Sequence, residues 1–164
     1  VSLDLLQSVL RLLLEERVSI RNLPLILEAV SDAKDRSASV DQIAEQVRQR
    51  LGFQITESLK DEEGQLPLIQ LKPDWEQVFH DHETLTEDGR STIALPPNEF
   101  NRLAGSIKDR LNDAAQKGRY PAIVVSAARR RFLQTVLSSK GVRNPVLSFE
   151  ELDPDTKPSL LGAA

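Results

Sequence analysis

Apolar residues recur at helical spacing through the first third of the chain. Leucines three or four positions apart mark residues 2–16, where Ser2 is placed to cap a helix, and a second apolar stripe covers residues 23–33 behind Asn22. The sequence Ser-Val-Asp-Gln that begins at Ser39 fits a capping box and opens a third stripe. These patterns predict three amphipathic helices, each with one buried face.

The third stripe continues past Gly52, because Phe53, Ile55 and Leu59 keep the apolar pattern. Gly52 therefore either ends the third helix or lies inside a longer one. A glycine in a helix interior costs only about 1 kcal/mol, so the apolar pattern favours a helix that runs through Gly52.

The periodicity changes after a charged turn at residues 60–65, which contains Asp-Glu-Glu-Gly and is the best candidate boundary between two subdomains. Residues 66–71 then predict a short strand. Pro67 places that strand at a sheet edge, because proline has no N–H to donate to a ladder. Pro73 follows and opens a helix that carries Trp75 on its inward side.

The last third of the chain predicts a β–α–β unit, preceded by a long amphipathic helix at about 99–117. Residues 122–125 form the apolar run typical of a buried strand, and residues 146–149 form a second. Ser126 is placed to cap the helix between them, which Gly141 ends. Two strands joined in this way pair in parallel through a right-handed crossover.

Polar composition predicts a loop at residues 82–91 and a loose tail at residues 153–164, which is rich in proline at its start. The chain as a whole is expected to be a mostly helical α/β protein. Its parts are a helical subdomain at 1–60, a small α/β subdomain with a short sheet at 61–152, and the flexible tail.

Composition narrows the functional classes. Aromatic residues are 4% of the chain, so aliphatic side chains must build the core, and the absence of cysteine excludes disulfides and thiolate chemistry. A formal net charge of −4 disfavours nucleic-acid binding. No stretch approaches the ~20 apolar residues that span a bilayer. The start at Val1 and the lack of methionine indicate a piece of a longer protein.

His80 and His82, with Asp81 and Glu83 beside them, are the most tempting metal or acid–base cluster. Residues at i and i+2 point roughly 200° apart on a helix, whereas helical metal sites space their ligands at i and i+4. A solvated helix end is the favoured interpretation. A metal-dependent enzyme that uses this segment stays open as an alternative.

The β–α–β unit raises a second alternative, a nucleotide-binding module. Its turn, Ser126-Ala127-Ala128-Arg129, lacks the glycines that let a pyrophosphate approach the backbone, and no P-loop or nucleophile motif occurs in the chain. We therefore predict a non-enzymatic protein without cofactor, catalytic or metal-binding residues.

Arg129, Arg130 and Arg131 form a run at the start of the last helix. One interpretation is a solvated face whose arginines pair with nearby acids, since charge runs are commonly just surface. The functional interpretation is a docking patch for an acidic partner. DNA binding is disfavoured because the rest of the chain is acidic.

Three stretches together resemble one family. They are VSIRNLP followed by ILEA at residues 18–29, VRQRL at residues 47–51, and PVLSFEEL at residues 145–152, which ends a unit that starts at Pro121. In this order they resemble the FHIPEP family, the large export-gate protein of flagellar and virulence type III secretion. The resemblance runs from about Leu3 to Leu152.

The resemblance implies the third and fourth cytoplasmic subdomains of such a gate, at the cytoplasmic face of the bacterial inner membrane. It implies self-association as a ring of nine in the full-length protein. Export chaperones and substrates would bind mainly through the full cytoplasmic domain. The stalk protein of the export ATPase would bind near the fourth subdomain, which makes Arg129, Arg130 and Arg131 its expected contacts.

Overall fold

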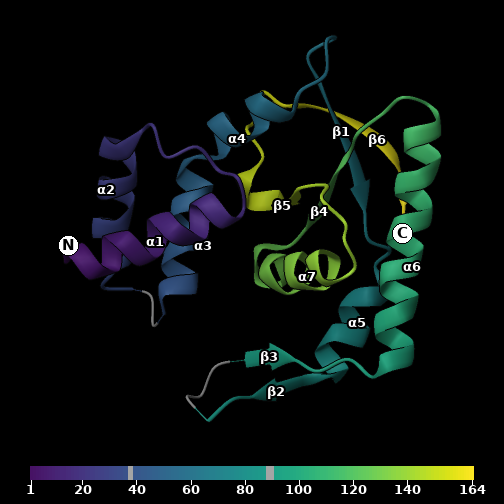
Figure 1. Cartoon of the computed structure of the whole chain (residues 1–164), viewed down its shortest axis with the longest axis horizontal. Coiled ribbons are helices and arrows are strands. Elements are labelled where there is room, and N and C mark those ends of the chain that lie inside the picture. Colours follow the sequence, from purple (N-terminus) through teal and green to yellow (C-terminus); the bar gives the residue numbers. More distant parts are fainter. Residues whose placement is uncertain (37–38, 88–90) are drawn as a thin grey trace. The chain divides into compact units, whose positions relative to one another are not determined.

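A computed structural model describes residues 1–36, 39–87 and 91–164, which form two compact units. Unit 1 comprises residues 1–60 and 150–156, and unit 2 comprises residues 61–149 and 157–164. The chain therefore passes between the units three times, first in the charged turn after Lys60 (Figure 1). That these units correspond to the family's third and fourth subdomains stays a prediction.

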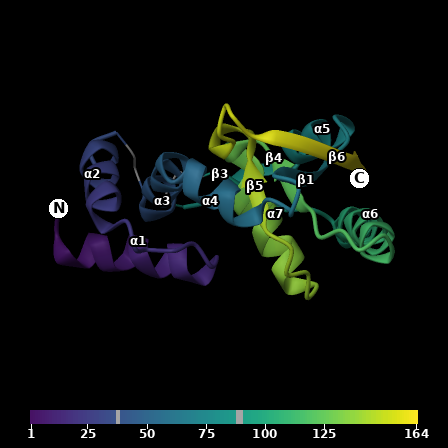
Figure 2. The ribbon, with the colours of Figure 1, turned by 90° about the horizontal axis from the view of Figure 1, so that it is seen from above.

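Unit 1 is helical, with α1 at Leu3–Glu15, α2 at Leu23–Ala33, α3 at Val40–Arg50 and α4 at Gly52–Leu59. Helix α3 packs against both α1 and α2 (Figure 2). The apolar stripes expected for the first three helices supply the buried side chains Val9, Leu13, Ile26, Val30, Ile43 and Val47. Within the described ranges, no helix is long and apolar enough to cross a bilayer.

Two of the three N-caps predicted in unit 1 form the expected side-chain hydrogen bond. The Ser2 hydroxyl accepts a hydrogen bond from the Leu5 N–H, and the Ser39 hydroxyl accepts one from the Gln42 N–H, both at 3.2 Å. Asn22 occupies the N-cap of α2, but its side chain makes no capping hydrogen bond to a described residue. Proline in the first turn of α2 already removes one of the N–H groups that a cap would satisfy.

The prediction of a helix running through Gly52 is wrong. Helix α3 ends at Arg50, Leu51 has φ −90° and ψ 6°, and α4 starts anew at Gly52. A Cβ on Gly52 would lie 2.1 Å from the carbonyl oxygen of Glu151. The glycine therefore serves the close approach of a second chain segment, which the local apolar pattern does not reveal.

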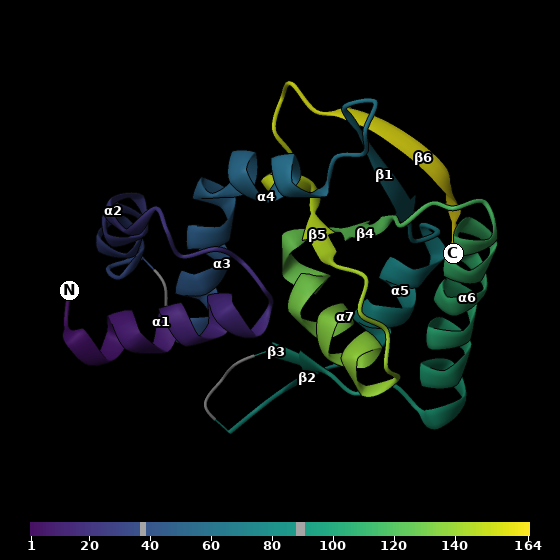
Figure 3. The ribbon, with the colours of Figure 1, turned by 45° about the horizontal axis from the view of Figure 1, so that its top comes forward.

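Unit 2 contains a four-stranded parallel sheet in the order β5-β4-β1-β6 (Figure 3). Its strands are β1 at Gln65–Gln70, β4 at Ala122–Val125, β5 at Val146–Ser148 and β6 at Lys157–Ala163. The predicted parallel pairing of β4 with β5 is confirmed, and α7 connects the two strands. All four side chains of β4 are buried, as the continuous apolar run indicates.

Two predictions about this sheet are wrong. Strand β1 lies inside the sheet, not at its edge. The pairing of β1 with β4 begins at Leu68, one residue after Pro67. At Pro67 itself, β1 pairs with β6 alone. The tail predicted at 153–164 is not loose, because residues 157–163 form β6 and pair with β1. The partner strand lies about 90 residues earlier in the chain, so local polarity could not indicate this pairing.

The helices of unit 2 are α5 at Asp74–Asp81, α6 at Pro97–Gln116 and α7 at Ala127–Ser139. Its core combines their inward side chains with one face of the sheet, and the members include Ile69, Trp75, Phe79, Leu103, Ile107, Ile123, Leu133 and Val146. Ser126 occupies the N-cap of α7, but its side chain forms no capping hydrogen bond within the described part of the chain.

A small antiparallel hairpin occupies part of the loop predicted at 82–91. Strands β2 at Glu83–Leu85 and β3 at Ser91–Ile93 pair with each other, while residues 88–90 of the predicted loop lie outside the described residues. All three residues of β2 are exposed, and in β3 only Ile93 is half-buried, so the hairpin lacks the apolar alternation that would predict it.

Candidate interaction site around Arg129

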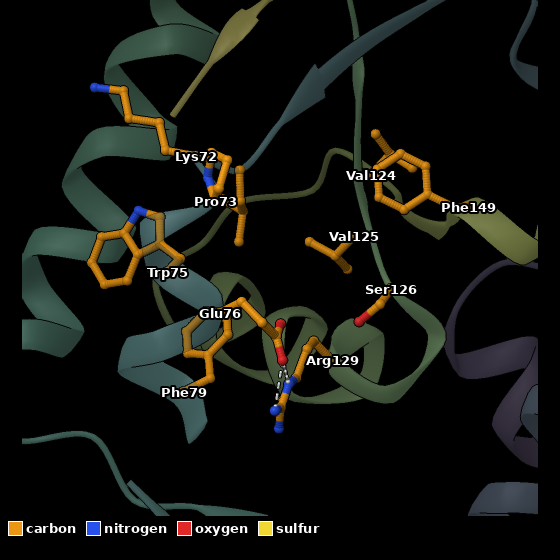
Figure 4. Close-up of a pocket in the computed structure, with 11 residues that line it drawn as sticks. Lys72, Pro73, Trp75, Glu76, Phe79, Val124, Val125, Ser126, Arg129 and Phe149 are labelled. Carbon is orange, nitrogen blue, oxygen red and sulfur yellow. Dashed lines mark hydrogen bonds and ion pairs between the residues drawn. The ribbon is translucent and has the colours of Figure 1, made fainter. Parts of the chain in front are cut away.

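Strands β1 and β4 run in parallel, so their carboxyl ends meet at one edge of the sheet, and α5 and α7 begin there. A cavity of about 150 Å³ opens at this edge. Its walls include Pro73, Trp75, Phe79, Val125, Ser126 and Phe149 (Figure 4). The mainly apolar walls suit an apolar side chain more than a charged group.

Arg129 in the first turn of α7 borders this cavity and is almost fully covered, with 10% of its side chain exposed. Its Nε and Nη2 donate hydrogen bonds to Glu76 Oε1 at 2.9 and 2.7 Å, as Figure 4 shows. Its Nη1 donates to Glu83 at the start of β2. One guanidinium thus ties α7 to α5 and to the base of the hairpin.

Arg129 and Glu83 stabilise each other's charged form. The hydrogen bond from Arg129 lowers the pKa of Glu83, and the neighbouring His80, at 3.5 Å, adds to the effect. Burial alone would lower the pKa of Arg129, but its hydrogen bonds to Glu76 and Glu83 outweigh burial and raise it. Two carboxylates therefore neutralise Arg129, so Arg129 does not offer a free positive charge to a phosphate.

The lowered pKa of Glu83 has a consequence for acid stability. A carboxyl whose pKa is lower in the folded state stabilises the fold above its ordinary pKa of 4.5, and that contribution is lost as the pH falls below 4.5. We expect Glu83→Gln to flatten this part of the pH profile, measured as thermal midpoints between about pH 7 and pH 3 at low salt. Glu62→Gln, at an exposed position in the same unit, is the matched control. An unchanged profile in Glu83→Gln would refute this role.

The three arginines of the run prove to have different environments. Arg130 is 1% exposed and donates through Nη1 to the carbonyl of Val146 at 3.3 Å. Arg129 is held in the ion pairs described above, whereas Arg131 is half-buried. Docking through these residues stays a prediction, and burial gives Arg129 and Arg130 structural roles inside unit 2.

The two histidines do not converge. His80 is 70% exposed, and the Nδ1 atom of His82 lies 2.8 Å from the carbonyl oxygen of Val78, within its own helix turn. Across residues 1–36, 39–87 and 91–164, no group of three or more His, Cys, Asp or Glu side chains is arranged to hold a metal ion. The geometry therefore gives the metal alternative no support, and the neutralised Arg129 gives none to the nucleotide alternative.

Sequence reasoning missed the partners of Arg129. Glu76 and Glu83 lie 53 and 46 residues before it, on a different helix and on a strand that was predicted to be loop. The available signal was the density of acids at residues 74–83, next to a run of arginines that needed counter-charges.

Comparison with known proteins extends over the whole chain. Residues 1–157 match the FHIPEP family. The flagellar biosynthesis protein FlhA of Caulobacter vibrioides is 35% identical over 162 residues, which cover 99% of this chain and 23% of that protein. This chain therefore spans less than a quarter of the length of that relative.

Two solved structures share the fold. The nonameric EPEC SctV-C has a TM-score of 0.88 at 24% identity, and the match covers 100% of this chain and 49% of that one. The Chlamydia pneumoniae CdsV protein, solved in complex with CdsO, has a TM-score of 0.81 at 21% identity, with coverage of 99% and 48%. The match over residues 1–157 and the identity to FlhA together show that this chain belongs to the FHIPEP family.

Proposed function

We propose that this chain is a non-enzymatic part of the cytoplasmic domain of a flagellar or type III protein export gate. The observation that carries the proposal is the similarity to Caulobacter FlhA over 99% of the chain, which includes both units. In this role the chain lies at the cytoplasmic face of the bacterial inner membrane and contributes to ring assembly and to docking of export components.

We base the proposed partners on two of the relatives. SctV-C is nonameric and CdsV was solved with CdsO, which supports self-association in a ring and a protein partner for this chain. We propose the stalk protein of the export ATPase as that partner. Export chaperones and substrates would bind mainly through the parts of the gate that relatives have beyond this chain.

A chimera tests the function directly. The matching segment of Caulobacter vibrioides FlhA is replaced by this chain in a strain that lacks its own FlhA. We expect restored swimming in soft agar and flagellin in the medium, because 35% identity over the segment preserves both units. A strain with the segment deleted is the control. A chimera that accumulates to the normal level without flagellin export would contradict the proposal.

The same chimera tests docking at Arg131, the least buried arginine of the run. Replacing all three arginines by Glu would put acids into buried positions at Arg129 and Arg130, so Arg131→Glu alone is used, in chimeras that accumulate to the normal level. We expect binding of the Caulobacter stalk protein to weaken roughly threefold or more in a pull-down. Arg11→Glu, on an exposed position of α1, is the control. Equal binding by both variants would remove Arg131 from the docking surface.

A further inference from the structure

Unit 1 buries an ionic cluster that the proposed function does not use. The Nε and Nη2 atoms of Arg48 donate hydrogen bonds to the two carboxylate oxygens of Glu151, both at 2.9 Å, and Nη1 donates to Glu16 at 2.8 Å. The side chains of Arg48, Glu16 and Glu151 are 4%, 8% and 0% exposed. We call these three residues the Arg48 cluster.

The geometry and burial of the Arg48 cluster distinguish it from the surface ion pairs of the same helix. The contact to Glu151 is the two-pronged pairing of guanidinium and carboxylate, which fixes orientation as well as distance. Arg50, on the same helix α3, makes ion pairs of similar length with Glu28 and Asp32, but at 40–63% exposure. Breaking the exposed pairs costs little, whereas removing one partner of the buried pair strands a charge away from water.

The position of Glu151 gives the cluster its significance. Glu151 lies in the segment 150–156, which belongs to unit 1, while Phe149 before it and Lys157 after it belong to unit 2. Strands β5 and β6, which flank the segment, are the two opposite edges of the sheet. Unit 2 therefore continues from both ends of the segment, and unit 1 holds the segment near its start, at Glu151, through Arg48 and through the tight approach at Gly52.

We infer that the Arg48 cluster couples the folding of the two units, so that they unfold as one cooperative body despite separate cores. Unfolding of unit 2 frees both ends of the segment and withdraws Glu151, which leaves Arg48 buried without that partner. Unfolding of unit 1 releases the segment 150–156, which connects the two edges of the sheet, and makes it a flexible loop. Closing that loop then costs entropy, which destabilises unit 2. This coupling does not depend on the export function proposed above.

The single tryptophan of the chain makes the coupling measurable. Trp75 is buried in unit 2, so its fluorescence reports that unit alone, whereas helical circular dichroism reports both units. In urea we expect the two signals of the unsubstituted chain to change together. In Glu151→Gln, the dichroism should acquire an earlier step without fluorescence change, about 1 M urea below the Trp75 midpoint.

Controls and a second variant decide the outcome. Glu28→Gln weakens the exposed ion pair on the same helix and should leave the two transitions coincident. Should Glu151→Gln fail to fold, Arg48→Lys keeps the charge, loses the two-pronged contact and is expected to separate the transitions in the same way. Transitions that already differ in the unsubstituted chain, or that stay coincident in the folded variant, overturn the inference.

Discussion

Gly52→Ala is expected to lower the free energy of unfolding by about 3 kcal/mol, because the new methyl group has no room. The added Cβ would stand 2.1 Å from the carbonyl oxygen and 3.0 Å from the carbonyl carbon of Glu151. Both atoms belong to backbone, so no side chain can rotate away. Relief requires a shift of the segment 150–156, which would also pull Glu151 from the two-pronged contact with Arg48.

A second glycine supplies the matched control for this substitution. Gly105 lies in the middle of α6, and apart from the neighbouring backbone of its own helix no described atom would come within 4 Å of an added Cβ. Gly105→Ala should raise the free energy of unfolding by about 0.5–1 kcal/mol, since alanine restricts the unfolded chain and favours the helix. Urea unfolding of both variants gives the comparison. A loss below about 1 kcal/mol in Gly52→Ala would show that the segment moves aside easily.

The elements that the sequence predicted correctly are those determined by nearby residues. The stripes of α1 to α3, the helix after Pro73, the long helix α6 and the β–α–β unit all depend on periodicity and caps within one turn or one strand. The order and direction of β4 and β5 also follow locally, because a short crossover through one helix leaves a single favoured pairing.

Three wrong predictions, those for the tail, for β1 and for Gly52, share a long-range cause. Strand β6 begins with Lys157, Pro158 and Ser159, which do not predict a strand, yet β1 pairs with it from far along the chain. The same pairing puts β1, with Pro67, inside the sheet. Gly52 looked tolerable in a longer helix because the atom that excludes a side chain there comes from Glu151.

The candidate site, too, could be predicted only as far as neighbouring residues determine it. The run at Arg129, Arg130 and Arg131 was visible as charge, but charge alone does not tell a docking patch from internal pairing. The distinguishing facts are the carboxylates of Glu76 and Glu83 and the burial of Arg130. The Arg48 cluster was still harder to foresee, since its two-pronged contact joins residues 103 positions apart.

Phe79→Ala is expected to cost about 3–5 kcal/mol of stability, as large apolar truncations in a core do. Phe79 is 1% exposed, and its ring lies 6.0 Å from that of Trp75 and 5.4 Å from that of Phe132, the latter edge to face. Truncation removes both aromatic contacts and leaves a void beneath α5. The same helix carries Glu76, so the ion pair with Arg129 should loosen as well.

Two further substitutions separate the void from a general effect of losing a phenylalanine. Phe79→Leu keeps most of the volume and should cost about 1.5 kcal/mol or less. Phe53→Ala, at a position 51% exposed in unit 1, should cost under about 1 kcal/mol. Urea unfolding followed through Trp75 measures the two Phe79 variants, and helical circular dichroism, which reports both units, measures Phe53→Ala. Trp75 emission should shift to the red only in Phe79→Ala, where water reaches the indole. A stability cost of Phe79→Ala no greater than that of Phe53→Ala would show that the contacts of Phe79 with Trp75 and Phe132 are not what holds α5 against the sheet. Arg129 alone would then have to hold Glu76 in place.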